Sequence, residues 1–334
     1  MQDTSTTTPK KRIEFVDIAK GIAMLAIVWG HAKGPGTWYL YEFHVPIFLI
    51  IAGYFLSARD PFGLFAKKKA ARLLGPYLFT ATFIFVATAV VSLVTDAFPW
   101  YTYLVGMVYG AGSFDAMLPA QNCVIGVIWF LQALFIALLE VRALTKVPKA
   151  APFIVVALTI AAVASSYVIW LPFNIQSGLC CGLFVYVGWL FKQAKLFEQS
   201  FGMWHMLLFG ALTVIAFELG IYVNLCVADL GTMCLGVIAA PIASVFVLMI
   251  SKYLERVKPV SCCLTWVGKN SMTIMCIHSC IFGTFSAFDM ADVLAAAGLG
   301  SVAWLIMFVV QVIAFIPLVY IVNHVPALRK VFVG

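Results

Sequence analysis

The chain has 334 residues, of which 63% are hydrophobic and only 10% are charged, and its mean hydropathy is +1.03. About a quarter of the residues in a soluble globular domain are charged, so this composition excludes a water-soluble protein and indicates an integral membrane protein. The net charge of +7 needs no nucleic-acid partner, because the placement of the basic residues described below accounts for it.

Residues 1–12 form a polar, Thr-rich tail that ends in Lys10, Lys11 and Arg12. We expect this tail to be disordered and cytoplasmic. The apolar run that follows has full membrane-spanning length, which argues against a cleavable signal peptide. Residues 13–334 contain no segment long enough for a separate soluble domain, so we expect them to form a single transmembrane domain.

The hydrophobic runs predict an all-α protein with about ten transmembrane helices. The expected spans are residues 14–33, 43–58, 73–95, 118–139, 151–170, 174–191, 203–222, 230–251, 270–287 and 299–323. An even number of spans places both termini on the same side of the membrane.

The basic residues indicate on which side of the membrane the termini lie, because loops rich in Lys and Arg stay in the cytoplasm. With a cytoplasmic amino terminus, only Lys33 falls outside among the basic residues of the loops. The inner side then receives Lys67, Lys68, Lys69, Arg72, Arg142, Lys146, Lys149, Lys192, Lys195, Lys252, Arg256, Lys258, Lys269, Arg329 and Lys330. This segregation predicts that both termini are cytoplasmic and that the protein is a multi-pass protein of the plasma or inner membrane.

The first span carries Asp17, Lys20 and His31 within RIEFVDIAKGIAMLAIVWGH. Ionisable residues inside a membrane span usually serve a function. Eleven helical positions correspond to about 16 Å of rise and return His31 to within about 20° of the face of Lys20. We therefore expect one polar stripe on this helix that lines an internal site.

Several motifs together make the chain similar to acyltransferase family 3, the integral membrane O-acyltransferases, and most similar to its fucose O-acetylase-like branch. They begin with Lys20 and His31, which have ten residues between them, and FHVPIFLIIAGYFLS at 43–57. They continue with RLLGPY at 72–77, WFLQALF at 129–135, FVYVGWLFK at 184–192 and GKNSMTIMCIH at 268–278. Each motif is weak alone, but their shared order over almost the whole chain is a strong signal.

The resemblance implies a membrane-bound enzyme that moves an acetyl or other acyl group from cytoplasmic acetyl-CoA, as co-substrate, to a hydroxyl group. The acceptor would be a cell-envelope, exopolysaccharide or lipid-linked glycan, and glycan-assembly proteins are candidate partners besides the surrounding lipids. The resemblance makes His31 essential. A neutral imidazole can act as general base on a sugar hydroxyl or can hold the acyl group itself, and the sequence leaves both roles open.

Lys20 is a candidate for binding the phosphates of coenzyme A or the thioester oxygen, and Asp17 could orient it through an ion pair. The alternative is a purely structural ion pair at the membrane boundary. Arg72 is a second candidate for the CoA phosphates, because guanidinium pairs well with phosphate. Arg72 could equally well anchor its helix at the cytoplasmic surface of the membrane without binding any ligand.

Four further residues are tentative substrate-binding candidates. His44 opens the second span beside a short outer loop, and Trp129 could line the acceptor path. His278 and Ser271 belong to the segment at 268–278. Alternatively, His44 could make loop hydrogen bonds and Trp129 could be an aromatic side chain at the membrane interface. His278 could be a buried histidine bonded to a neighbouring helix, and Ser271 could cap a helix.

Two chemistries are not expected. Many relatives carry Ser-Gly in the second span where this chain has Ala52 and Gly53, so a serine nucleophile there is excluded, and Gly53 could instead allow close helix contact. Cys276, His278 and Cys280 point about 200° apart in succession on a helix, so we expect no metal site.

Two other functions compete with the enzyme. A ten-helix secondary transporter could use the stripe on the first span as its polar path, although the halves of the chain show no obvious repeat. A non-catalytic partner in a polysaccharide-export complex is the other alternative. Cleavage of a thioester that depends on His31 would separate the enzyme from both.

Overall fold

A computed structural model describes residues 13–333 apart from 96–99, 114 and 286–289, so the expected tail at residues 1–12 lies outside the described residues. The described part is all-α, and its only extended pairing is a bridge between Asn224 and Asp229. One helix falls within or across each expected span: α1 (Glu14–His31), α3 (Pro46–Tyr54), α4 (Phe62–Thr95), α6 (Trp129–Leu144), α7 (Ala151–Ser166), α8 (Ile175–Gln193), α9 (Met203–Glu218), α10 (Gly236–Leu254), α12 (Ser271–Phe285) and α14 (Ala303–His324).

The remaining helices lie between these or follow them: α2 (Thr37–Leu40), α5 (Trp100–Tyr109), α11 (Lys258–Lys269), α13 (Met290–Ala296) and α15 (Pro326–Phe332). Short 3₁₀ turns, including η1 (Gly126–Ile128) and η4 (Leu225–Val227), join several of them. The ten expected spans therefore match real helices, but the sequence analysis did not predict the additional ones.

Several expected boundaries are wrong, among them those of the second, third and fourth spans. The second span contains only the nine-residue α3, which begins at Pro46, and α4 begins at Phe62 instead of residue 73. The fourth span begins at Trp129 instead of residue 118. Hydropathy registers apolar side chains, whereas a helix can continue through charged residues such as Lys67 and an apolar loop can precede it.

Five helical segments in the described part are long and apolar enough to cross a membrane: Phe62–Val90, Gly126–Leu144, Pro172–Gln193, Gly236–Leu254 and Gly300–His324. Shorter apolar helices accompany them. Val310, Ile313 and Ile316 of α14 are each more than half exposed, as expected of side chains that face lipid. The chain is thus an all-α integral membrane protein, and the cytoplasmic placement of its termini remains a prediction from the charges.

Glycines bring pairs of helices into backbone contact, which is a common way to pack helices in membranes. A Cβ atom on Gly53 of α3 would overlap the Val185 carbonyl of α8, and one on Gly188 of α8 would overlap the Ile50 carbonyl of α3. This confirms the close contact expected at Gly53. Gly21 of α1 makes a similar approach to α11.

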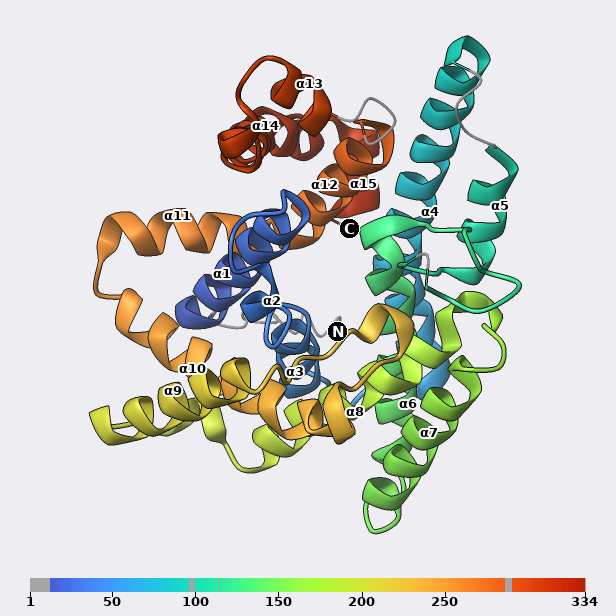
Figure 1. Cartoon of the computed structure of the whole chain (residues 1–334). Helices are drawn as coiled ribbons and strands as arrows, with labels where there is room; N and C mark the ends of the chain where they lie inside the picture. Colours follow the sequence, from blue (N-terminus) through green and yellow to red (C-terminus); the bar gives the residue numbers. More distant parts are fainter. Residues whose placement is uncertain (1–12, 96–99, 114, 286–289, 334) are drawn as a thin grey trace, which may run out of the picture.

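These contacts place the helices that surround the site. In Figure 1, α1 and α3 lie opposite α4 and α6, and α12 lies beside α1. Arg142 of α6 is buried, and its Nη2 donates hydrogen bonds to the carbonyls of Ala58 and Asp60 at 3.2 and 2.8 Å. Arg142 therefore fixes the connection from α3 to α4 against α6.

Candidate functional site

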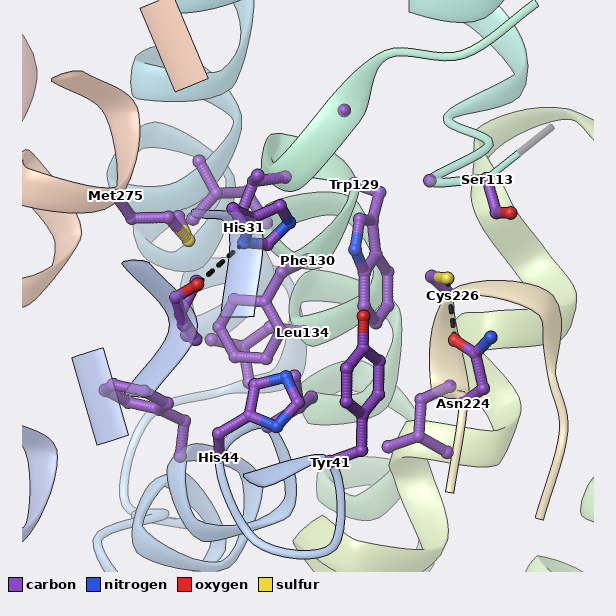
Figure 2. Close-up of a pocket in the computed structure, with 18 of the residues that line it drawn as sticks. His31, Tyr41, His44, Ser113, Trp129, Phe130, Leu134, Asn224, Cys226 and Met275 are labelled. Atoms are coloured by element: carbon purple, nitrogen blue, oxygen red, sulfur yellow. Dashed lines mark hydrogen bonds between the residues drawn. The ribbon is translucent and has the colours of Figure 1, made fainter. Parts of the chain in front are cut away.

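A cavity of about 530 Å³ lies between α1, α3, α4, α6 and α12 and extends to the connections that contain η1 and η4. His31, His44, Trp129 and Ser271, which the sequence analysis singled out, all line it. Figure 2 shows His31, His44, Trp129 and Tyr41 around the same space. The fold therefore brings four predicted site residues from four helical regions to one cavity.

His31 is the last residue of α1, and its ring is held in one orientation. Its Nδ1 lies 2.8 Å from the carbonyl oxygen of Ile27, one turn earlier. A carbonyl can only accept, so Nδ1 must donate and the neutral ring keeps an unprotonated Nε2. In Figure 2 the second ring nitrogen of His31 lies on the side opposite the dashed hydrogen bond and points toward Trp129. His31 can therefore accept a proton or attack a carbonyl carbon inside the cavity.

His278 packs directly against His31, with ring centroids 5.0 Å apart in an edge-to-face arrangement. It is fully buried on α12, and its Nδ1 is 2.8 Å from Oε1 of Gln311 on α14. Its Nε2 is buried and has no hydrogen-bond partner among the described residues. His278 thus supports one side of the His31 ring from outside the cavity lining.

His44 precedes α3 and faces the cavity from the other side. Its Nδ1 donates to the Leu40 carbonyl at 2.6 Å, and its ring packs edge-to-face on Tyr41 with centroids 4.9 Å apart. Like His31, His44 therefore keeps Nε2 as an acceptor. In the described part of the chain, no group of His, Cys, Asp and Glu side chains is arranged to hold a metal ion.

Lys20, Asp17 and Arg72 do not line the cavity. The expected ion pair is present, with Nζ of Lys20 2.6 Å from Oδ1 of Asp17, and Asp17 is buried where α1 contacts α11. Arg72 is exposed, although the next residue, Leu73, lines the cavity. The polar stripe expected along α1 therefore reaches the cavity only at His31.

A family model described as an acyltransferase domain matches residues 13–324 of this chain. The chain belongs to this acyltransferase family. Among curated proteins, it is similar to the nodulation protein NolL of Mesorhizobium japonicum, with 30% identity over 43% of this chain and 39% of NolL. The chain thus spans less than half the length of that relative. No solved structure matches it.

The sequence analysis of this acyltransferase-family protein missed the polar residues at one end of the cavity. Ser113 and Asp115 lie in the connection between α5 and η1, and Asn224 and Cys226 lie at η4. They sit in loops with no periodic pattern and outside every recognised motif. Only the fold shows that two connections more than a hundred positions apart meet.

Glu42, between α2 and α3, is fully buried, and neither carboxylate oxygen has a partner among the described residues. Burial raises the pKa of Glu42 to about 8. The folded protein therefore keeps this proton at pH values where the unfolded chain, with a pKa near 4.5, has lost it. The free energy of unfolding should fall as pH rises from about 4.5 through about 8.

Glu42→Gln should remove this loss and stabilise the protein at pH 8 by roughly 2 to 4 kcal/mol, with little effect at pH 4.5. Thermal unfolding in lipid nanodiscs between pH 4.5 and 8 measures the effect. Glu14→Gln, at an exposed carboxylate, is the control. Identical pH profiles for wild type and Glu42→Gln would contradict the prediction.

Proposed function

We propose that the protein is an O-acetyltransferase that moves an acetyl group from cytoplasmic acetyl-CoA to a hydroxyl of a cell-envelope, exopolysaccharide or lipid-linked glycan at the plasma or inner membrane. One observation carries the proposal. His31 presents an unprotonated Nε2 to a large cavity in a chain that belongs to an acyltransferase family. A sugar hydroxyl is a poor nucleophile, and such a nitrogen can activate it.

In the general-base route, the acceptor hydroxyl donates its proton to Nε2 of His31 as its oxygen attacks the thioester carbonyl. The C–S bond then breaks, and the imidazolium returns the proton to the departing CoA thiolate. The products are an O-acetyl ester and free CoA. The hydrogen bond from Nδ1 to the Ile27 carbonyl stabilises the positive charge that the ring carries between these two proton transfers.

In the acyl-carrier route, Nε2 of His31 attacks the thioester carbonyl, the C–S bond breaks and CoA leaves as a thiolate before the sugar enters. The sugar oxygen then attacks the acetyl group on the ring, the C–N bond breaks to release neutral His31, and the hydroxyl proton passes to solvent. The same tautomer serves this route, because Nδ1 keeps its proton in both. Rapid denaturation at neutral pH of the enzyme mixed with radiolabelled acetyl-CoA, without acceptor, separates the two. Radiolabel retained on His31 supports the acyl-carrier route. An unlabelled His31 in an enzyme that transfers acetyl groups normally supports the general-base route.

We assign Lys20 to binding of the donor and not to the reaction itself. It lies about 16 Å along α1 from His31, a separation comparable to the extended pantetheine arm that joins the thioester of acetyl-CoA to its phosphates. Lys20 is a quarter exposed, whereas its partner Asp17 is buried. The ammonium group can therefore contact a phosphate without leaving Asp17. Arg72, exposed at the start of the apolar part of α4, is a second candidate cation.

Lys20→Ala should raise the KM for acetyl-CoA by about tenfold, the equivalent of one charge-assisted hydrogen bond, and leave kcat within about twofold. Lys20→Arg should keep most of the affinity. Initial rates of free-thiol release at varied acetyl-CoA measure both. A normal KM for acetyl-CoA in Lys20→Ala, in a protein of unchanged thermal stability, would remove the donor role.

The proposed function itself is tested with purified protein in lipid nanodiscs, by following free-thiol release from acetyl-CoA with and without a mixed glycan extract. Release that requires the extract, with mass-spectrometric detection of acetylated glycan, supports the transferase. A folded protein that binds no acetyl-CoA and releases no thiol would contradict it and favour the transporter.

A further inference from the structure

We propose that Ser113, Asp115 and Asn224 form the subsite that recognises the hydroxyl groups of the acceptor sugar, next to Trp129. This set is called the loop subsite below. The inference rests on the proposed function and adds to it the residues that hold the acceptor. All four residues line the cavity that contains His31, yet they come from three separate parts of the chain.

The hydrogen-bonding groups of the loop subsite are only partly used within the protein. Ser113 Oγ donates to Oδ2 of Asp115 at 2.8 Å, and no described residue donates to Oδ1 of Asp115. Oδ1 of Asn224 accepts from the Cys226 thiol at 2.9 Å, and Nδ2 of Asn224 has no partner among the described residues. The subsite therefore offers a carboxylate acceptor and an amide donor, and a sugar hydroxyl can both donate and accept.

Gly112 explains why these connections can meet. A Cβ atom there would overlap the indole ring of Trp129 and lie 2.8 Å from Cβ of Cys226. The absence of a side chain thus brings the loop with Ser113 against Trp129 and against the loop with Asn224. Figure 2 shows Trp129 between His31 on one side and Ser113 and Cys226 on the other, so its ring offers a flat face beside the polar groups.

Backbone hydrogen bonds hold the two connections in place. The amide of Ile125 donates to the carbonyl of Ala111 at 2.9 Å and closes the first loop. In the second, Asn224 and Asp229 exchange two backbone hydrogen bonds of 3.0 Å, and Oδ1 of Asp229 accepts from the Gly231 amide at 2.8 Å. These bonds fix the loop backbones before any ligand binds, which reduces the entropic cost of binding one.

Apart from His31, Tyr41, His44 and Ser271, the remainder of the cavity lining is largely apolar. Met24, Leu73, Leu134 and Met272 line it with apolar side chains, and Met24 lies on α1 between Lys20 and His31. Apolar walls on the side of Lys20 suit the acetyl and pantetheine groups of the donor. The polar groups gather at the loops, so the two substrates would approach His31 from opposite parts of one cavity.

The test measures sugar binding without turnover. Binding of methyl α-L-fucopyranoside, methyl β-D-glucopyranoside and methyl N-acetyl-β-D-glucosaminide to the His31→Ala protein in nanodiscs is followed by saturation-transfer NMR. Adding Asp115→Asn or Asn224→Ala should weaken binding of the preferred glycoside by about tenfold, because the first replaces a charged acceptor by a neutral one and the second removes an amide donor. Ser113→Ala should have a smaller effect.

Asp292→Asn is the matched control, since Asp292 of α13 is exposed like Asp115 and undergoes the same charge change, but does not line the cavity. Thermal unfolding verifies that each variant is folded. Unchanged binding in both Asp115→Asn and Asn224→Ala, or no binding of any of the three glycosides to the parent, would overturn the loop subsite.

The test keeps the subsite and the proposed reaction separate. Glycoside binding that depends on Asp115 and Asn224, in a protein whose wild-type form transfers no acetyl group, would retain the subsite and remove the reaction. Acetyl transfer with unchanged acceptor KM in the Asp115→Asn and Asn224→Ala proteins, with His31 intact, would retain the reaction and remove the subsite.

Discussion

Replacing His31 with alanine is expected to lower acetyl transfer by about 10²- to 10⁴-fold, the usual contribution of a positioned general base, and by more if the ring carries the acyl group. The physical reason is that the cavity then loses the nitrogen that Ile27 holds in its unprotonated form. The protein should still insert and fold, because alanine is an excellent helix former and His31 is the last residue of α1.

His324→Ala is a close control for this change. His324 is also the last residue of a long helix, and its Nδ1 donates to the carbonyl of Tyr320, one turn earlier, at 2.8 Å. It is exposed and lies outside the cavity lining. Acetylation of a glycan extract, quantified by mass spectrometry, should be normal in His324→Ala. Wild-type acetylation in His31→Ala would refute a catalytic role for His31.

The second large effect is on stability. Gly188→Ala should destabilise the protein by about 1 to 3 kcal/mol, because the added methyl group would overlap the Ile50 carbonyl and push α3 away from α8. The added methyl group would meet backbone atoms, so no change of side-chain rotamer can relieve the clash. Phe48, which lines the cavity from α3, would shift as well, so acetyl transfer should also fall.

Gly63→Ala is the control for this substitution, because a Cβ atom there meets nothing within 4 Å. Gly63 lies at the start of α4, where alanine should be neutral or stabilise by up to about 1 kcal/mol. Thermal unfolding in nanodiscs measures both variants. Equal melting temperatures for Gly188→Ala and Gly63→Ala would contradict the prediction, because they would mean that α3 and α8 leave room for a methyl group at position 188.

The site was only partly predictable from the sequence. His31, His44, Trp129 and Ser271 were singled out and do line one cavity. From helical geometry alone, Lys20 was expected on the same face of α1 as His31, and therefore in the same site. However, α11 packs closely on the early turns of α1, so the part of the stripe near Asp17 and Lys20 faces a neighbouring helix and the surface instead.

The sequence by itself determined that the chain is an all-α membrane protein, the approximate position of its apolar helices, the family to which it belongs and the histidine that faces the cavity. These follow from local composition, from the 3.6-residue repeat and from motifs, which need no knowledge of the fold. The tertiary structure alone decided the rest. The tautomer of His31 depends on the rotamer that brings its Nδ1 to the Ile27 carbonyl, one turn earlier in α1. The support from His278 and the meeting of Ser113, Asp115 and Asn224 depend on contacts between distant segments, and loops carry no periodicity from which such contacts could be predicted.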